Sequence, residues 1–439
     1  MGRMFPLLPA HVPDDQAIVD FAKGIPAKPA ENPPNPAIRA GFTFLGQFID
    51  HDTTFDKSSL LVGSNDPDTL ISESSAKFDL DSVYGDGPAG TPQFYDPSDP
   101  AKLRLVINQH GVLDVPRDSN GKAIIADPRN DQTVILIQLQ IAFMRFHNAI
   151  VDLVRSQGVA EDLVFTTAQQ MVRWHYQWVV VHEYLPITAG QRVVDQVLVL
   201  DESGVPTVLN QFFLPSLDSA FIPVEFSVAA FRFGHTQVRD RYRVNPIRNT
   251  VGLLGTFDNS LIGGRPVPAD LVIEWGNFFP ISGSSITPQT SMRIDGRISL
   301  PLGKLPVSAY PGIGNVKNLA ERNMRRAKSF GLPSGQQVAA LMGAQVFTNA
   351  ELGVPDAGFQ NEAPLWFYIL KEGDLQQNGN RLGQVGARIV VEVLLGLMAA
   401  DSTAYLVADA LFQPVPPIAP SDGTFTTGDL LKFAGTAGP

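Results

Sequence analysis

The side chains that could do chemistry are gathered in a few short stretches, and the first of them surrounds His51. Over residues 47–52, helical spacing places Gln47, Asp50 and His51 on one face and turns Asp52 away by about 100°. The neighbouring residues are apolar, and polar groups that point inward from an apolar helix are costly unless a ligand meets them. We therefore treat this stretch as a candidate ligand or cofactor site.

A second stretch carries oxygen-bearing side chains at alternate positions. In extended backbone Ser75, Asp79 and Asp81 would face one side, with the carbonyl of Lys77 between them. Such an oxygen-rich set suits Ca²⁺, which takes six to eight oxygen ligands. An EF-hand is excluded, because Tyr84 stands where that loop needs its glycine. The alternative is a solvated edge strand.

Three shorter stretches complete the set. Arg129 and Gln132 lie three residues apart at the start of a predicted long helix, where an arginine is otherwise an ordinary surface charge. His235 follows Gly234 in an aromatic run; the alternative for this residue is a core histidine with satisfied hydrogen bonds. Asn323 offers a carbonyl that could accept a hydrogen bond from the ring N–H of a metal-bound histidine.

The elements that must position these residues are mainly helices. Apolar periodicity predicts a protein of the mainly α class, with long ordered loops and little β structure. Helices are expected over residues 40–53, 129–155, 160–184 (stopped by Pro186), 224–238 and 384–411, with another opening at a capping box formed by Ser334 and Gln337, and an irregular span over 245–315. The expected organisation is an extended N-terminal arm (1–36), one large domain (37–413) and a C-terminal loop (414–439).

Composition narrows the possible partners and metals. The 439 residues include 33 Lys and Arg against 44 Asp and Glu, a net charge of −11 that argues against a nucleic-acid partner. Without cysteine there can be no disulfide, thiolate nucleophile or cysteine-bound metal. No apolar stretch reaches the about 18 residues of a membrane span, the longest being Ile389 to Ala400, and no cleavable signal peptide is seen. We expect a cytoplasmic protein or one exported without a leader.

Taken together, the stretches resemble, in order and local spacing, the animal-type haem peroxidases of the peroxidase–cyclooxygenase superfamily. The resemblance covers about residues 36 to 400. It implies that residues 37–413 form a single α-helical haem peroxidase catalytic domain. In that family's terms, His51 is the distal histidine, Arg129 the catalytic arginine and His235 the axial iron ligand, with Asn323 hydrogen-bonded to it.

The same resemblance assigns the remaining candidates. Asp52, together with Ser75, the Lys77 carbonyl, Asp79 and Asp81, would bind calcium. Two further residues fall at haem-contacting positions of the family: Arg232 would bind a propionate, and Gln47 would orient a distal water or halide.

The departures from the family pattern concern mainly how haem is held. Members with covalent haem use an Asp and a Glu for ester links; Asp50 is present here, but Gln132 stands at the glutamate position, so at most one ester is expected, through Asp50. Thr133 excludes a sulfonium link. Arg232 occupies the position of the radical-forming tyrosine of the superfamily's fatty-acid oxygenases. The lack of cysteine suggests a bacterial-like member.

The implied function is a haem-dependent peroxidase that reduces hydrogen peroxide and oxidises halides or phenolics through an oxyferryl intermediate. His51 would move the peroxide proton and Arg129 would stabilise the developing charge. The implied cofactors are haem b and Ca²⁺. Three alternatives remain: a fatty-acid oxygenase of the same superfamily, a metal-dependent phosphohydrolase built on His51 and Asp52, and a non-catalytic calcium-binding adhesion module. The sequence makes no prediction of oligomeric state.

Overall fold

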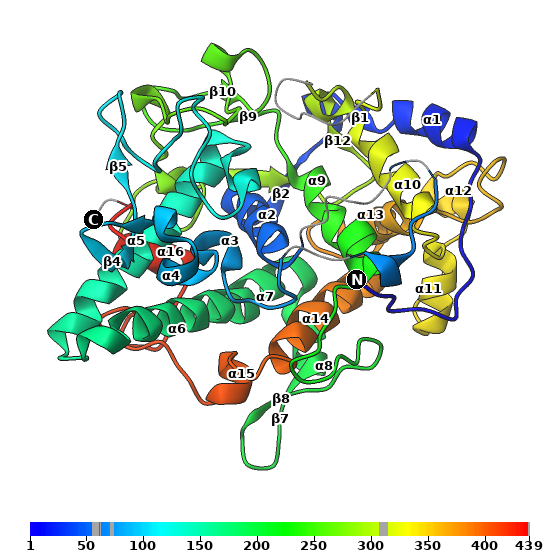
Figure 1. Ribbon diagram of the computed structural model, residues 1–439. Coiled ribbons are helices and arrows are strands. Elements are labelled where there is room, and N and C mark those ends of the chain that lie inside the picture. Colours follow the sequence, from blue (N-terminus) through cyan, green and yellow to red (C-terminus); the bar gives the residue numbers. More distant parts are fainter. Residues whose placement is uncertain (55–60, 62, 71–73, 307–314, 438–439) are drawn as a thin grey trace.

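The computed structural model describes residues 1–54, 61, 63–70, 74–306 and 315–437, and it is mainly helical, as predicted (Figure 1). The α-helices are α1 (Asp15–Lys23), α2 (Ala40–Thr53), α3 (Asp81–Tyr84), α4 (Gly87–Gly90), α5 (Val134–Ser156), α6 (Glu161–Val179), α7 (Leu185–Ala189), α8 (Gln191–Val197), α9 (Gly234–Gln237), α10 (Leu319–Ser329), α11 (Gly335–Leu341), α12 (Asn349–Leu352), α13 (Leu365–Gln377), α14 (Gln384–Ala399), α15 (Tyr405–Ala408) and α16 (Thr427–Phe433).

In the described parts of the chain, strands form only two-stranded ribbons. The pairs are β1 (Pro26–Ala27) with β12 (Ile298–Ser299), β2 (Pro34–Arg39) with β11 (Thr290–Met292), β3 (Tyr95–Asp96) with β4 (Asp99–Leu103), β5 (Val106–Ile107) with β6 (Leu113–Asp114), β7 (Leu198–Leu200) with β8 (Pro206–Val208), and β9 (Arg241–Tyr242) with β10 (Val251–Gly252). The β1–β12 pair is parallel and the β2–β11 pair is antiparallel. The expected irregular span 245–315 holds only short elements, and its residues 307–314 lie outside the description.

Helix α2 lies near the centre of the molecule and contacts α5, α9 and β11 (Figure 1). Its bounds confirm the predicted helix over 40–53, and most of its residues are buried. Two glycines let it approach its neighbours closely. A side chain at Gly41 would collide with the ring of Phe279, and one at Gly46 with the hydroxyl of Tyr184. The sequence around His51 is therefore held in place on several sides.

The predicted long helix from Arg129 is wrong at its start. Asp127 caps a separate 3-10 helix (Pro128–Asp131) by accepting from the backbone N–H of Arg129 at 2.8 Å. Thr133 then caps α5, accepting from the N–H of Leu136 at 3.1 Å. Two capping residues six positions apart break the chain into two helical pieces, so the helical-face argument for Arg129 does not apply.

Two other predicted helices exist but are irregular. The helix expected to stop at Pro186 continues from α6 through a π-helix (Val180–Tyr184) into α7, which accommodates Pro186 in its first turn. The helix expected over 224–238 is a π-helix (Glu225–Ala229), a 3-10 helix (Ala230–Phe233) and then α9. Irregular turns of this kind are frequent at functional sites.

Both predicted terminal loops contain helices. The N-terminal arm includes α1, and Met4, Phe5 and Ile18 join the hydrophobic core. Glu225, fully buried, accepts from the backbone N–H groups of Met4 and Phe5. The C-terminal segment includes α16, and the helix expected over 384–411 ends at Ala399. Helices α10 and α13 were not predicted from the apolar pattern, whereas the Ser334–Gln337 capping box is confirmed.

Helix α5, with 23 residues, is long and apolar enough to cross a membrane by length and composition, unlike the shorter apolar segment Ile389 to Ala400. However, 83% of its most apolar window is buried inside the protein. This burial is what a core helix of a folded domain shows.

Burial of a histidine on α6 gives a testable pH dependence. The imidazole of His175 is 2% exposed, and burial lowers its pKa to about 4. Because the unfolded chain takes up the proton near pH 6.5 while the folded chain does not, stability conferred by this group is lost as pH falls from about 6.5 to 4. The ring of His175 packs against Phe146, Phe412 and Phe425, so phenylalanine should fit in its place. The free energy of unfolding of the wild type should fall between pH 7 and pH 5, and we expect His175→Phe to make this fall smaller by up to ~2 kcal/mol.

Urea unfolding at the two pH values measures this difference, with the exposed His110→Phe as the matched control. An unchanged pH dependence in His175→Phe, or an equal change in the control, would contradict the assignment.

Candidate active site

His51 and His235 line one cavity of about 340 Å³, within the size range of ligand clefts. His51 comes from α2 and His235 from α9, which contact each other although the residues are far apart in sequence. We call this space the central cavity. Its wall also includes five other predicted site residues: Gln47, Asp50, Arg129, Gln132 and Arg232.

The distal part of the cavity is organised around His51, which is 5% exposed. Its Nδ1 lies 2.8 Å from the side-chain oxygen of Asn130, and the amide nitrogen of Asn130 donates to the side-chain oxygen of Gln140 at 2.9 Å. Burial, and then the positive charge of Arg129, lower the pKa of His51 to about 4, outweighing the carboxylates of Asp127 and Asp50. The imidazole is therefore neutral near pH 7 and can act as a base.

The guanidinium of Arg129 is fixed from two sides. Its Nη2 donates to the backbone carbonyl of His51 at 2.8 Å. Its Nε and Nη2 donate to the carboxylate of Asp127 at 3.0 and 2.6 Å. A charge-assisted pair of this geometry restricts the side chain, so the positive charge stays beside His51.

Another part of the cavity wall is organised around His235, whose Nδ1 lies 2.9 Å from the amide nitrogen of Asn323 on α10. The pair is confirmed, but the direction is the reverse of the prediction: here Asn323 donates, because Nη1 of Arg232 faces its oxygen at 3.4 Å. A ring that offers Nε2 to a metal carries its proton on Nδ1. Metal ligation by His235 therefore requires the Asn323 amide to turn by 180°.

Arg232 is held by backbone groups around the irregular helix. Its Nε donates to the carbonyl of Ser227 at 2.9 Å, and its own carbonyl accepts from the indole of Trp366 at 3.2 Å. Burial and the charge of Arg232 lower the pKa of His235 to about 3, so this imidazole is neutral near pH 7.

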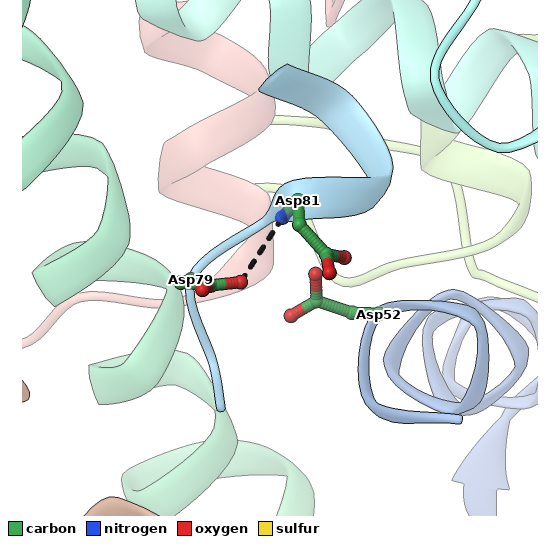
Figure 2. A group of neighbouring side chains, drawn as sticks. All are labelled: Asp52, Asp79 and Asp81. Carbon is green, nitrogen blue, oxygen red and sulfur yellow. Dashed lines mark hydrogen bonds between the residues drawn. The ribbon is translucent and has the colours of Figure 1, made fainter. Parts of the chain in front are cut away.

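A cluster of three carboxylates joins Asp52 of α2 to Asp79 and Asp81 at the start of α3 (Figure 2). One ligand oxygen from each of Asp52, Asp79 and Asp81 lies within 4.8 Å of the others. Burial and mutual repulsion raise the pKa of Asp52 well above its usual value and that of Asp81 to about 7. Among the described residues, Oδ2 of Asp52 and Oγ of Ser75 are buried without a hydrogen-bond partner. These oxygens fit a hard cation.

The remaining predicted ligand, Lys77, directs its side chain elsewhere. Its ammonium pairs with Asp401 at 2.9 Å and Asp218 at 3.3 Å. The predicted ligand is its backbone carbonyl, which stays a prediction. Between the two loop aspartates, Leu80 adopts a left-handed backbone with φ of 56°. Such strain in a residue other than glycine is typical of loops shaped for binding.

Three residues that support the distal site were missed in the sequence: Asn130, Gln140 and Asp127. The pattern Asp127-Pro128-Arg129 is a typical start of a helical turn and could have identified Asp127. Asn130 and Gln140 gave no such signal, because their role depends on where the 3-10 helix brings them relative to α2.

Comparison with known proteins decides the family. The animal haem peroxidase family model matches residues 53–349, about two thirds of the chain. The chain belongs to the animal haem peroxidase family. The match begins just after His51 and Asp52, so the distal residues are placed by the geometry described above. This family typically binds haem.

Two curated relatives agree with this family assignment. It is 25% identical over 241 residues to the chorion peroxidase of Drosophila melanogaster, covering 52% of this chain and 27% of that protein. It is 30% identical over 222 residues to a peroxidase-like protein of Margaritifera margaritifera, covering 47% and 26%. The aligned regions thus span about a quarter of these relatives' lengths, and neither relative supports the expected bacterial-like origin.

Solved structures share the fold. Peroxidase A from Dictyostelium discoideum superimposes with a TM-score of 0.67 at 14% identity, covering 98% of this chain and 90% of that one. The fatty acid alpha-dioxygenase of Arabidopsis thaliana gives 0.65 at 13% identity, covering 98% and 74%. At these identities the likeness concerns the fold alone.

Proposed function

We propose that the chain is a haem peroxidase that reduces hydrogen peroxide and oxidises small donors, halides or phenolics. The observation that carries this proposal is that two neutral imidazoles, His51 and His235, line the same cavity, with the fixed charge of Arg129 beside the first. Bound haem would supply the redox chemistry.

The residues of the cavity fit this cofactor. His235 would bind the haem iron through Nε2 once the Asn323 amide turns so that its oxygen accepts from Nδ1–H. Arg232 and Arg322 place two guanidinium groups on the cavity wall, suited to the two propionates, and Leu302 and Leu305 among others supply apolar surface for the porphyrin. Gln132 cannot form an ester, so at most one covalent link is expected, through Asp50, whose side chain lines the cavity.

The side chains of the protein would transfer the proton and stabilise the developing charge. Nδ1 of His51 is engaged by Asn130, so Nε2 is the nitrogen that would take a proton from hydrogen peroxide and return it to the departing oxygen. The Arg129 guanidinium would stabilise the negative charge that develops on that oxygen. Gln47, one turn before His51 and also on the cavity wall, would hold a distal water or halide.

Calcium would occupy the carboxylate cluster. Asp52 follows His51 directly, so an ion held by Asp52, Asp79, Asp81 and Ser75 would fix α2 and with it the distal histidine. The same arrangement argues against the phosphohydrolase alternative, because His51 faces the central cavity whereas Asp52 faces the carboxylate cluster.

The second candidate function is fatty-acid oxygenation, favoured by the fold shared with alpha-dioxygenases. Arg232 in place of the radical-forming tyrosine argues against it. The haem-loaded protein should oxidise bromide or a phenol when hydrogen peroxide is added, and should take up no oxygen with linoleate. Oxygen uptake with linoleate and no peroxide-dependent donor oxidation would favour the oxygenase and contradict the proposal.

A further inference from the structure

Three buried side chains form a hydrogen-bonded line that leads away from the central cavity. His51, Asn130 and Gln140 are 5%, 0% and 1% exposed. They are joined by contacts of 2.8 Å, from His51 Nδ1 to Asn130 Oδ1, and 2.9 Å, from Asn130 Nδ2 to Gln140 Oε1. The three come from different elements: α2, the 3-10 helix and α5.

The position of Asn130 is fixed by its backbone as well. Its N–H donates to the carbonyl of Asp127 at 3.1 Å, within the same turn that places Arg129. The only freedom left to its side chain is therefore which end of the amide faces which neighbour. That choice decides the protonation of the histidine, because an amide oxygen can only accept and an amide nitrogen can only donate.

We propose that Asn130 is a positioning residue that holds His51 with its proton on Nδ1 and its Nε2 lone pair toward the cavity. The Asn130 nitrogen donates to the oxygen of Gln140, whose own Nε2 is buried without a partner among the described residues, and the Asn130 oxygen is thus the end that accepts from His51 Nδ1–H. The inference rests on the proposed function, since it explains how His51 is kept ready to accept a proton at Nε2.

The opposite arrangement has a defined consequence. If both amides were turned, the Asn130 nitrogen would donate to Nδ1, and the proton of the neutral ring would sit on Nε2. That imidazole could not take a proton from peroxide. An amide also orients the ring without adding a charge, whereas a carboxylate in the same place would add a negative charge next to the imidazole.

The test is the tautomer of His51, read by NMR of the full chain labelled with ¹⁵N-histidine and loaded with diamagnetic zinc protoporphyrin. His51→Gln identifies the signal by its loss. We expect Nδ1 protonated and Nε2 unprotonated. Gln140→Glu is decisive, because a carboxylate only accepts and forces Asn130 into the proposed direction; the tautomer should stay as in the wild type.

Asn130→Leu removes the acceptor at nearly constant volume. We expect loss of the single tautomer and a roughly 10- to 100-fold slower reaction with hydrogen peroxide in the haem-loaded protein, the usual effect of losing a group that orients a ligand or base. The matched control is Asn148→Leu on α5, which loses two hydrogen bonds to Leu103 and should keep the wild-type tautomer and rate.

A wild-type ring protonated on Nε2, or a tautomer that switches in Gln140→Glu, would overturn the inference. Failure of the proposed function is distinguishable. If no porphyrin is taken up, the spectrum is recorded on the porphyrin-free chain, since the three residues belong to the protein. If the ring is Nδ1-protonated but peroxide is not consumed, the function fails while the tautomer assignment holds.

Discussion

Replacing His51 by alanine is expected to slow the reaction of the haem-loaded protein with hydrogen peroxide by about 10²- to 10⁴-fold, the usual contribution of a positioned general acid–base. The reason is geometric: Nε2 of His51 is the nitrogen left available to the cavity, and burial together with Arg129 keeps the ring neutral. Stopped-flow measurement of the peroxide reaction gives the rate directly.

Haem uptake by the variant serves as the control. Because His235 comes from a different helix, His51→Ala should still take up haem with the wild-type stoichiometry and absorption spectrum. A wild-type rate in His51→Ala would remove His51 from the mechanism. A slow rate accompanied by lost haem uptake would show a structural role instead.

Removal of calcium is the second large effect expected. Without a cation, Asp52, Asp79 and Asp81 repel one another in a buried cluster, as the raised pKa values of Asp52 and Asp81 indicate. An ion present at 100 times its Kd stabilises the folded state by about 2.7 kcal/mol. Prolonged chelation should therefore lower Tm and weaken haem binding, and added Ca²⁺ should restore both.

Asp52→Ala should abolish this response to chelator and Ca²⁺, whereas Asp118→Ala, which changes an exposed turn, should retain it. Metal analysis of the purified protein should find one Ca²⁺ per chain. A chelator response preserved in Asp52→Ala would place the ion elsewhere, and a Tm indifferent to chelation in the wild type would remove the calcium site altogether.

The sequence was sufficient to predict a helix where the apolar spacing agrees with the face that is buried. Helix α2 was predicted at its observed bounds because its apolar residues keep the spacing of one regular helix that is buried along most of its length. It was insufficient where capping side chains interrupt a periodic pattern, as Asp127 and Thr133 do before α5. Short helices at the termini, such as α1 and α16, were hidden by nearby prolines.

The same division applies to the site. His51, His235 and Arg129 could be chosen only because the stretches that carry them together resemble a known family, and the structure brings the three residues to one cavity. Asn130 and Gln140 are ordinary polar residues whose importance arises only from the tertiary contact with His51. The direction of the Asn323 amide likewise depends on its neighbour Arg232, which no local pattern encodes.

Titration of the purified chain with haem, followed by absorbance and electron paramagnetic resonance, tests the central claim most directly. The wild type should bind one haem per chain with a single histidine ligand. In His235→Ala that ligation should be lost, and added imidazole should restore it by entering the space left by the side chain. Absence of stoichiometric haem uptake, or histidine ligation that persists in His235→Ala, would contradict the account.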